Sequence, residues 1–206
     1  IEIYPVPIAD FTFDSVCFPL EVQFTDLSDA NGAYDITVWQ WQFSDGQASS
    51  VQGPSMDFGM PGEFAAELLI TNGPGCKSSQ AKGNAVVHPL PVADFPDGLA
   101  VCSEDTVFFN DESSISPITD DEIIDWNWDL DDGTFITAQN GYRIYEGPDI
   151  YSVHLTVATN PACSDDLTKI VVIYPLPPVL ICSSPFDGCH PLRVQFFHPT
   201  SIAAPS

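Results

Sequence analysis

The chain repeats itself at a spacing of 84 to 87 residues, and this periodicity constrains the fold more than any other feature of the sequence. A short apolar segment with two prolines occurs three times, at residues 3–7, 87–91 and 173–177. A repeat of this length is long enough for one small domain, so each interval is expected to fold as a module. We predict residues 1–6 to end a preceding module or linker, 7–90 and 91–176 to form modules 1 and 2, and 177–206 to begin a truncated third module.

Cysteines and a tryptophan segment recur in the same order within each copy. The tryptophan segment at residues 39–46 matches the one at residues 126–133 and is the most specific signal of the repeat. A start cysteine follows each proline segment, and an end cysteine closes each complete copy. The start cysteines are Cys17, Cys102 and Cys189, and the end cysteines are Cys76 and Cys163.

The third copy is expected to be incomplete, because it has no room for a tryptophan segment or an end cysteine. Two arrangements of its cysteines stay open. Either Cys182 pairs with Cys189, or Cys189 pairs with a cysteine beyond Ser206, as its alignment with Cys17 indicates.

Alternating apolar and polar residues predict strands. Leu20, Val22 and Phe24 are separated by single polar residues, and residues 64–70 and 151–157 show the same period of two. This period is typical of a strand with one buried and one exposed face. The 19 prolines and 13 glycines leave little uninterrupted chain for helices. The sequence therefore predicts an all-β fold of tandem β-sandwiches, joined in a linear rod because short proline-containing junctions limit bending.

The cysteines predict disulfides and an oxidising compartment. The start and end cysteines enclose 60 residues in the first copy and 62 in the second. We therefore predict bonds between Cys17 and Cys76 and between Cys102 and Cys163. Closing loops of this size contributes roughly 4 kcal/mol in the chain-entropy model. The complete modules lack the closely spaced cysteine or histidine pairs that zinc sites need.

Acidic residues dominate the charge of the chain. It contains 29 Asp plus Glu against 5 Lys plus Arg, a formal net charge of -24 at pH 7. Such a surface repels phosphate backbones and anionic lipid head groups, which excludes nucleic acid and membrane surfaces as partners. The longest apolar runs are far shorter than the about 20 residues of a bilayer-spanning helix. These features predict an extracellular protein with no membrane insertion.

Six acidic residues around the second tryptophan segment are the candidate metal ligands. Calcium prefers carboxylate oxygens, and a bound ion would offset the local repulsion. Their spacing does not match a defined calcium loop, and a solvated acidic face is the simpler explanation. Calcium is the only cofactor considered, and its candidate ligands are Asp120, Asp121, Glu122, Asp129, Asp131 and Asp132.

The tryptophan segments, together with the turns at residues 61–64 and 148–151, resemble the polycystic-kidney-disease (PKD) domain family. Members of this family are immunoglobulin-like β-sandwiches found in tandem in surface proteins, and the resemblance covers nearly all of residues 7–175. The placement of the cysteines resembles a variant found in very large secreted and gliding-associated proteins of Bacteroidota. The resemblance implies a core signature of Trp39, Trp41, Asp45, Gly46, Trp126, Trp128, Asp132 and Gly133.

The signature residues are expected to be structural. Gln40 and Gln42 alternate with the tryptophans of the first segment, which puts both indoles on one face and favours core packing over a sugar-stacking platform. Each Asp-Gly pair is expected to form a hairpin turn, in which glycine supplies a positive φ.

No catalytic motif accompanies these modules. The sequence contains no Gly-x-Ser-x-Gly elbow, His-Glu-x-x-His motif or phosphate loop, so we do not predict an enzyme. The resemblance implies the stalk of a secreted bacterial cell-surface adhesin or filament, including gliding-associated ones. Its partners would be neighbouring modules and a surface polysaccharide or protein ligand. The alternatives are accessory carbohydrate- or protein-binding modules of a secreted hydrolase, and a cell-envelope lattice protein.

Overall fold

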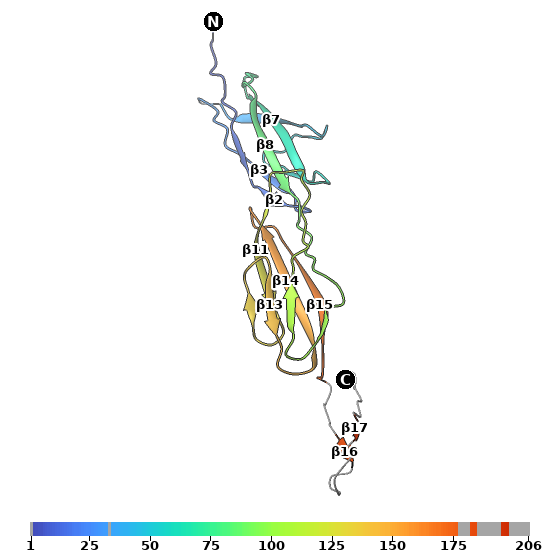
Figure 1. The fold of residues 1–206 in the computed structure, drawn as a ribbon. Coiled ribbons are helices and arrows are strands. Elements are labelled where there is room, and N and C mark those ends of the chain that lie inside the picture. The colour runs from blue at the N-terminus through green and yellow to red at the C-terminus, as the bar shows by residue number, and fades with distance from the viewer. Residues whose placement is uncertain (1, 33, 177–181, 185–194, 198–206) are drawn as a thin grey trace. The chain divides into compact units, whose positions relative to one another are not determined.

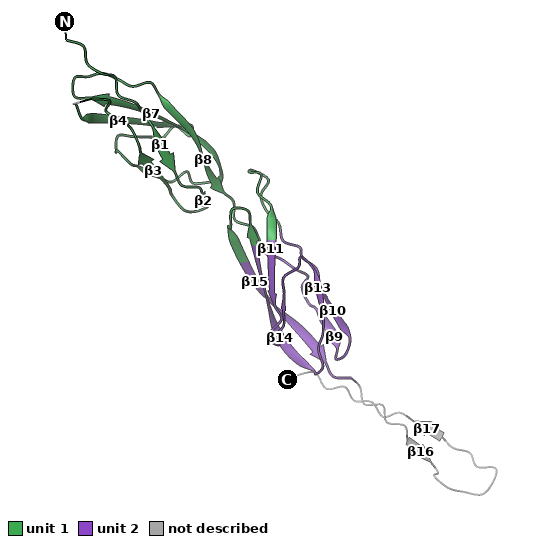
Figure 2. Cartoon of the chain, turned by 90° about the vertical axis from the view of Figure 1, so that its left-hand side faces the viewer, with its two compact units in different colours: residues 1–92, 114–124, 158–165 green, residues 93–113, 125–157, 166–206 purple. Residues whose placement is uncertain are grey.

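The computed structural model describes residues 2–32, 34–176, 182–184 and 195–197. The regular secondary structure of this part is made of strands, and it contains no helix long and apolar enough to cross a membrane. The chain divides into two compact units (Figure 2). Unit 1 contains residues 1–92, 114–124 and 158–165, and unit 2 contains residues 93–113, 125–157 and 166–206.

The strands are bounded by turns rich in glycine, proline and aspartate, and Figure 1 shows their order along the chain. The first repeat contains β1 (Phe11–Phe13), β2 (Val16–Cys17), β3 (Val22–Asp26), β4 (Ile36–Phe43), β5 (Ala48–Ser49), β6 (Ser55–Met56), β7 (Gly62–Asn72) and β8 (Ala81–His88). The second contains β9 (Ala100–Cys102), β10 (Thr106–Phe109), β11 (Ile123–Asp129), β12 (Phe135–Ile136), β13 (Gly141–Ile144), β14 (Asp149–Thr159) and β15 (Ser164–Tyr174).

Two further strands, β16 (Cys182–Ser184) and β17 (Gln195–Phe197), pair antiparallel. The side chains of Cys182 and Cys189 lie outside the described residues, as does most of the predicted third module. Neither arrangement predicted for these cysteines is therefore addressed by the structure.

The first repeat forms a five-stranded sheet, ordered β2-β8-β7-β4-β5, and a three-stranded sheet, ordered β1-β3-β6. Burial alternates along β7, whose even-numbered residues are buried, as a strand with one face on a core requires. The interior is aromatic. Trp41 packs edge-on against Phe11 with ring centroids 5.0 Å apart, and Phe24 lies 5.5 Å from the same indole.

The second repeat has a five-stranded sheet of order β12-β11-β14-β15-β9, and β10 pairs with β13. Trp128 takes the place of Trp41: it is fully buried and lies edge-on to Phe95, with ring centroids 5.2 Å apart. Val153 and Leu155 of β14 are also fully buried. The predicted all-β fold of tandem sandwiches is confirmed.

In both repeats the strand with the start cysteine runs parallel to the last strand. β2 pairs with β8 so that Cys17 lies opposite His88, and β9 pairs with β15 so that Cys102 lies opposite Tyr174. His88 and Tyr174 are the final residues of their strands. Cys17 and Cys102 therefore each lie where the last strand of their own repeat ends.

Candidate functional site

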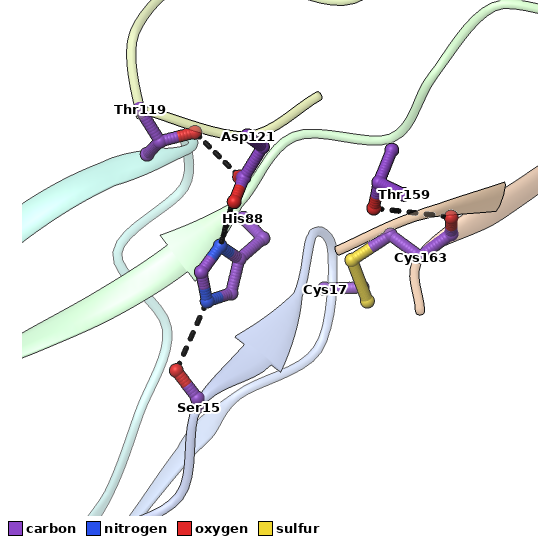
Figure 3. The surroundings of a disulfide bond; sticks show 7 residues. All are labelled: Ser15, Cys17, His88, Thr119, Asp121, Thr159 and Cys163. Carbon is purple, nitrogen blue, oxygen red and sulfur yellow. Dashed lines mark hydrogen bonds and ion pairs between the residues drawn. A yellow bond between two sulfur atoms is a disulfide. The ribbon is translucent and has the colours of Figure 1, made fainter. Parts of the chain in front are cut away.

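A disulfide bond between Cys17 and Cys163 is the centre of the candidate functional site, which lies within unit 1 (Figure 3). Cys17 is the last residue of β2, and Cys163 ends the turn between β14 and β15. The two Cα atoms are 5.7 Å apart, although 146 positions separate the residues in the sequence. The bond therefore joins the start cysteine of the first repeat to the end cysteine of the second.

This connectivity corrects the predicted pairing of Cys17 with Cys76 and of Cys102 with Cys163, because Cys76 and Cys102 carry no disulfide. Within the first repeat, Cys17 lies opposite His88, the last residue of β8, whereas Cys76 comes before Ala81, the first residue of β8. A strand rises about 3.3 Å per residue, so roughly 25 Å separate the two cysteines along β8. Disulfide-bonded Cα atoms are at most about 7 Å apart.

The same geometry separates the cysteines of the second repeat. Cys102 lies opposite the last residue of β15, and Cys163 immediately precedes the first residue of that strand. The two cysteines of one repeat therefore lie at opposite ends of its last strand. Similar spacing along the sequence does not make them neighbours.

His88 forms a polar network beside the disulfide (Figure 3). Its Nδ1 lies 2.8 Å and 3.0 Å from the two carboxylate oxygens of Asp121, and its Nε2 lies 3.0 Å from Oγ of Ser15. The Thr119 hydroxyl donates to Asp121 Oδ2 at 2.5 Å. The side chains of His88 and Asp121 are 12% and 8% exposed, so water screens their contact weakly. Hydrogen bonds thus hold the end of β8 against residues 114–124 next to the covalent link.

The turn that presents Cys163 is closed by local hydrogen bonds. The N–H of Thr159 donates to the Cys163 carbonyl at 2.9 Å, and the Thr159 hydroxyl donates to the same oxygen at 3.2 Å. The N–H of Asn160 donates to the Glu122 carbonyl at 3.2 Å, which joins this turn to the segment that contains Asp121. Both Thr159 and Cys163 are buried. The cysteine is therefore held in a defined position.

Asp121→Ala is expected to destabilise unit 1 by about 1 to 3 kcal/mol, because the part-buried His88 ring and the Thr119 hydroxyl lose their acceptor. Asp121→Asn keeps an amide oxygen in the same place and is the matched control, with a distinctly smaller loss expected. Urea unfolding of the oxidised proteins measures both. Equal losses for the two variants would contradict the hydrogen-bonding explanation.

The signature tryptophans line the sandwich interiors to different depths. Trp41 and Trp128 are fully buried, whereas Trp39 and Trp126 are half-buried. The Trp39 indole donates to Asp26 Oδ2 at 2.7 Å, and the indoles of Trp41 and Trp128 donate to backbone carbonyls. Within the part of the chain that the structure describes, Nε1 of Trp126 has no hydrogen-bond partner. In each tryptophan segment, one of the two indoles is therefore completely buried in the core.

Both signature Asp-Gly pairs form tight turns. Gly46 and Gly133 have φ values of 91° and 81°, a conformation that residues with side chains rarely adopt. Asp45 and Asp132 each accept, through Oδ1, the N–H of the residue two positions later, at 3.0 Å and 2.9 Å. A carboxylate that bonds its own turn in this way stabilises the reversal between strands.

The sequence profile of the PKD domain matches the chain twice in tandem, at residues 5–87 and 88–173. The chain belongs to the PKD domain family.

Solved structures similar to this chain include single PKD domains and a longer immunoglobulin segment. The PKD1 domain of Vibrio anguillarum Epp is 22% identical, with a TM-score of 0.36, and the match covers 41% of this chain and 99% of that domain. The PKD1 domain of the Vibrio cholerae metalloprotease PrtV is also 22% identical, with a TM-score of 0.36 and coverage of 40% and 98%. A three-domain immunoglobulin segment of a titin variant has a TM-score of 0.51 at 15% identity, covering 96% of this chain and 78% of that one. The fold of the tandem PKD domains is therefore immunoglobulin-like.

The six candidate calcium ligands of the second PKD domain have separate surroundings. Asp121 contacts His88, Asp132 contacts Arg143, Asp129 and Asp131 accept backbone N–H groups, and Asp120 and Glu122 are exposed. Among the described residues, no group of three or more His, Cys, Asp or Glu side chains is placed to hold a metal ion. We therefore assign no calcium site.

Asp132→Asn is expected to lower stability by about 1 kcal/mol at about pH 7 and to have little effect near pH 2. Arg143 Nε donates to Asp132 Oδ2 at 2.6 Å, and the Asp132 side chain is 14% exposed. Burial alone would raise the pKa of Asp132, but hydrogen bonds from Arg143 and Thr134 lower it overall. A lowered folded-state pKa stabilises the protein above the unfolded value, near pH 4, and this contribution is lost as the pH falls through the folded value.

Urea unfolding of both proteins across this pH range measures that difference for Asp132. A gap between wild type and variant that stays constant down to the lowest pH would contradict the assigned cause.

Sequence reasoning did not single out His88 or its hydrogen-bond partners Ser15 and Thr119. A signal for them does exist in the repeat. Tyr4 has the repeat position of His88, and Tyr34 has that of Asp121. The two tyrosine rings pack edge-on with centroids 5.4 Å apart. The first copy thus has two tyrosines where the second has a histidine and an aspartate. When both members of a pair change together between copies, the two positions are expected to be in contact.

Proposed function

We propose that this chain is a non-enzymatic stalk segment of a secreted bacterial cell-surface adhesin or filament. The observation that carries the proposal is the bond between Cys17 and Cys163, which ties one PKD repeat to the next. A covalent tie between successive modules resists their separation under load, and a stalk must bear load. A gliding-associated adhesin of Bacteroidota is the narrower form of this proposal, and it rests on the sequence resemblance.

Charge and redox chemistry support an extracellular location. A structural disulfide forms and persists in oxidising compartments. The net charge of -24 suits a solvated surface that repels nucleic acid and anionic lipid. PKD and immunoglobulin-like folds are typically non-catalytic modules. Because a fold hosts many functions, the proposal rests on the cross-link and not on the fold.

Labelling of intact cells of the source organism tests the stalk proposal directly. Antibodies raised against this chain are expected to bind intact cells and to detect a high-mass protein that external protease removes. Detection only inside the cell, or in a secreted protein with a catalytic domain, would overturn the proposal. Terminal sequencing of the detected protein distinguishes these outcomes.

A second candidate function is that of accessory carbohydrate-binding modules of a secreted hydrolase. Phe108 and Tyr142 are cross-strand neighbours on β10 and β13, with ring centroids 6.5 Å apart. Their exposed fractions are 61% and 66%. Exposed aromatic rings of this kind can stack on sugar rings.

A glycan array probed with the purified chain and with the Phe108→Ala/Tyr142→Ala variant tests this second candidate. Binding that is lost in the variant would favour a carbohydrate-binding module. An absence of binding by both proteins would favour the stalk.

A further inference from the structure

Two described cysteines, Cys76 and Cys102, have no disulfide partner, and they occupy the repeat positions of the bonded pair. Cys102 is a start cysteine like Cys17, and Cys76 is an end cysteine like Cys163. Both free cysteines are half-buried. Each of them therefore has a bonded counterpart in the other repeat, against which its local structure can be compared.

The turn that carries Cys76 has the hydrogen-bond pattern of the turn that carries Cys163. The N–H of Asn72 donates to the Cys76 carbonyl at 3.1 Å, as the N–H of Thr159 donates to the Cys163 carbonyl at 2.9 Å. The residue before each cysteine has a positive φ, 89° in the first repeat and 74° in the second. The same turn thus presents both end cysteines.

Cys102 and Cys17 also occupy matching backbone positions in their repeats. Cys102 lies opposite Tyr174 in a parallel strand pair, as Cys17 lies opposite His88. The residue after each cysteine donates its N–H to the carbonyl of Tyr174 or His88, at 2.8 Å and 2.9 Å respectively. Cys102 therefore lies at the end of module 2, in the same position that Cys17 has at the end of module 1.

Cys76 is linked through hydrogen bonds to residues 4–5, which align with the end of the last strand of the first repeat and the residue after it. Asn72 makes this link: its Nδ2 donates to the Pro5 carbonyl at 3.0 Å, and its Oδ1 accepts the N–H of Cys76 at 2.9 Å. Tyr4, which precedes Pro5, has the repeat position of His88. The strand partner of His88 is the start cysteine Cys17. By the same pairing, the strand partner of Tyr4 would be the start cysteine of a preceding module.

We propose that every junction in an array of these modules carries the same cross-link, from the start cysteine of one module to the end cysteine of the next. Cys102 then bonds the end cysteine of the module that follows module 2. Cys76 bonds the start cysteine of the module that precedes module 1. The cross-links overlap along the array, because each spans two modules.

Each new bond removes two protons and two electrons from a pair of thiols. A disulfide of the oxidising compartment, on a small molecule or a protein, accepts them and is reduced to two thiols. The repeat register and the observed bond support these cross-links, whether or not the array belongs to an adhesin.

Peptide mapping of the oxidised 206-residue chain, after alkylation without reduction, is the first test. The expected result is a linked peptide pair that contains Cys17 and Cys163, with Cys76 and Cys102 alkylated. Bonds from Cys17 to Cys76 and from Cys102 to Cys163 would overturn the proposal.

A duplicated chain is the second test. Residues 1–172 followed directly by residues 3–206 place four modules in register, since Ile3 and Tyr4 replace Ile173 and Tyr174. The expected result is a new bond from Cys102 of the first copy to Cys76 of the second, in a chain that runs as a monomer on a non-reducing gel. Linked peptides of Cys17 and Cys163 report that both copies have folded.

Serine variants of the duplicated chain provide matched controls. Cys102→Ser in the first copy, or Cys76→Ser in the second, is expected to remove the new bond. The same two substitutions in the opposite copies are expected to leave it intact. Full alkylation of Cys76 and Cys102 in both copies of the folded chain would overturn the proposal, as would bonds between separate chains.

Discussion

Cys163→Ser is expected to lower the free energy of unfolding by about 4 kcal/mol relative to the oxidised wild type. The bond closes a loop between residues 146 positions apart, which restricts the unfolded chain. The chain-entropy model gives about 5 kcal/mol for a loop of this length, and about 4 kcal/mol when one module stays folded and shortens the loop. Urea unfolding followed by tryptophan fluorescence measures the loss.

Cys76→Ser is the matched control for this stability prediction, because Cys76 is an end cysteine like Cys163 but is half-buried and carries no bond in this chain. Its expected effect is within about 0.5 kcal/mol, as for other substitutions that break no named interaction. If Cys76→Ser destabilises the chain as much as Cys163→Ser does, the bond lies within the first module and the cross-link between repeats is refuted.

The oxidised chain, pulled from its two ends, is expected to extend about 500 Å less than the reduced chain, because an extended residue contributes at most about 3.5 Å. The load passes from Cys17 directly to Cys163, so the segment between these residues, which are 146 positions apart, cannot lengthen the molecule when the modules unfold. In the reduced chain both modules release their full length. Single-molecule force spectroscopy with and without a reductant measures the difference.

Two variants separate the cross-link from other effects of reduction in the pulling experiment. Cys163→Ser is expected to extend fully even without a reductant, whereas Cys102→Ser is expected to extend as the oxidised wild type does. Full extension of the oxidised wild type would show that the bond does not carry the load.

The strands and the core were predictable because their signals are local. The period of two at residues 64–70 and 151–157 reappears as alternating burial in β7 and β14. Trp41 and Trp128 come from matching segments and fill matching places in two cores. A repeated pattern of side chains specifies the same sandwich twice, since the alternation alone determines which face of each strand is buried.

The candidate site was only partly predictable. The sequence identified Cys17 and Cys163 as disulfide cysteines, and it drew attention to Asp121, but it assigned other partners to all three. The sequence groups Asp121 with its acidic neighbours as a candidate calcium ligand, whereas its carboxylate contacts His88, 33 positions away. Sequence proximity suggested a shared ion, and the fold directs these side chains to different partners.

The tandem of all-β PKD modules can be inferred from the sequence alone, because strand period, turn residues and repeat length are properties of neighbouring residues. The pairing of the cysteines, in contrast, depends on the folded chain. The parallel pairing of β2 with β8 carries Cys17 to one end of its module, away from Cys76 and within bonding distance of Cys163. Which residues meet across 146 positions depends on where the strands end in space, and a pattern along the chain does not contain that information.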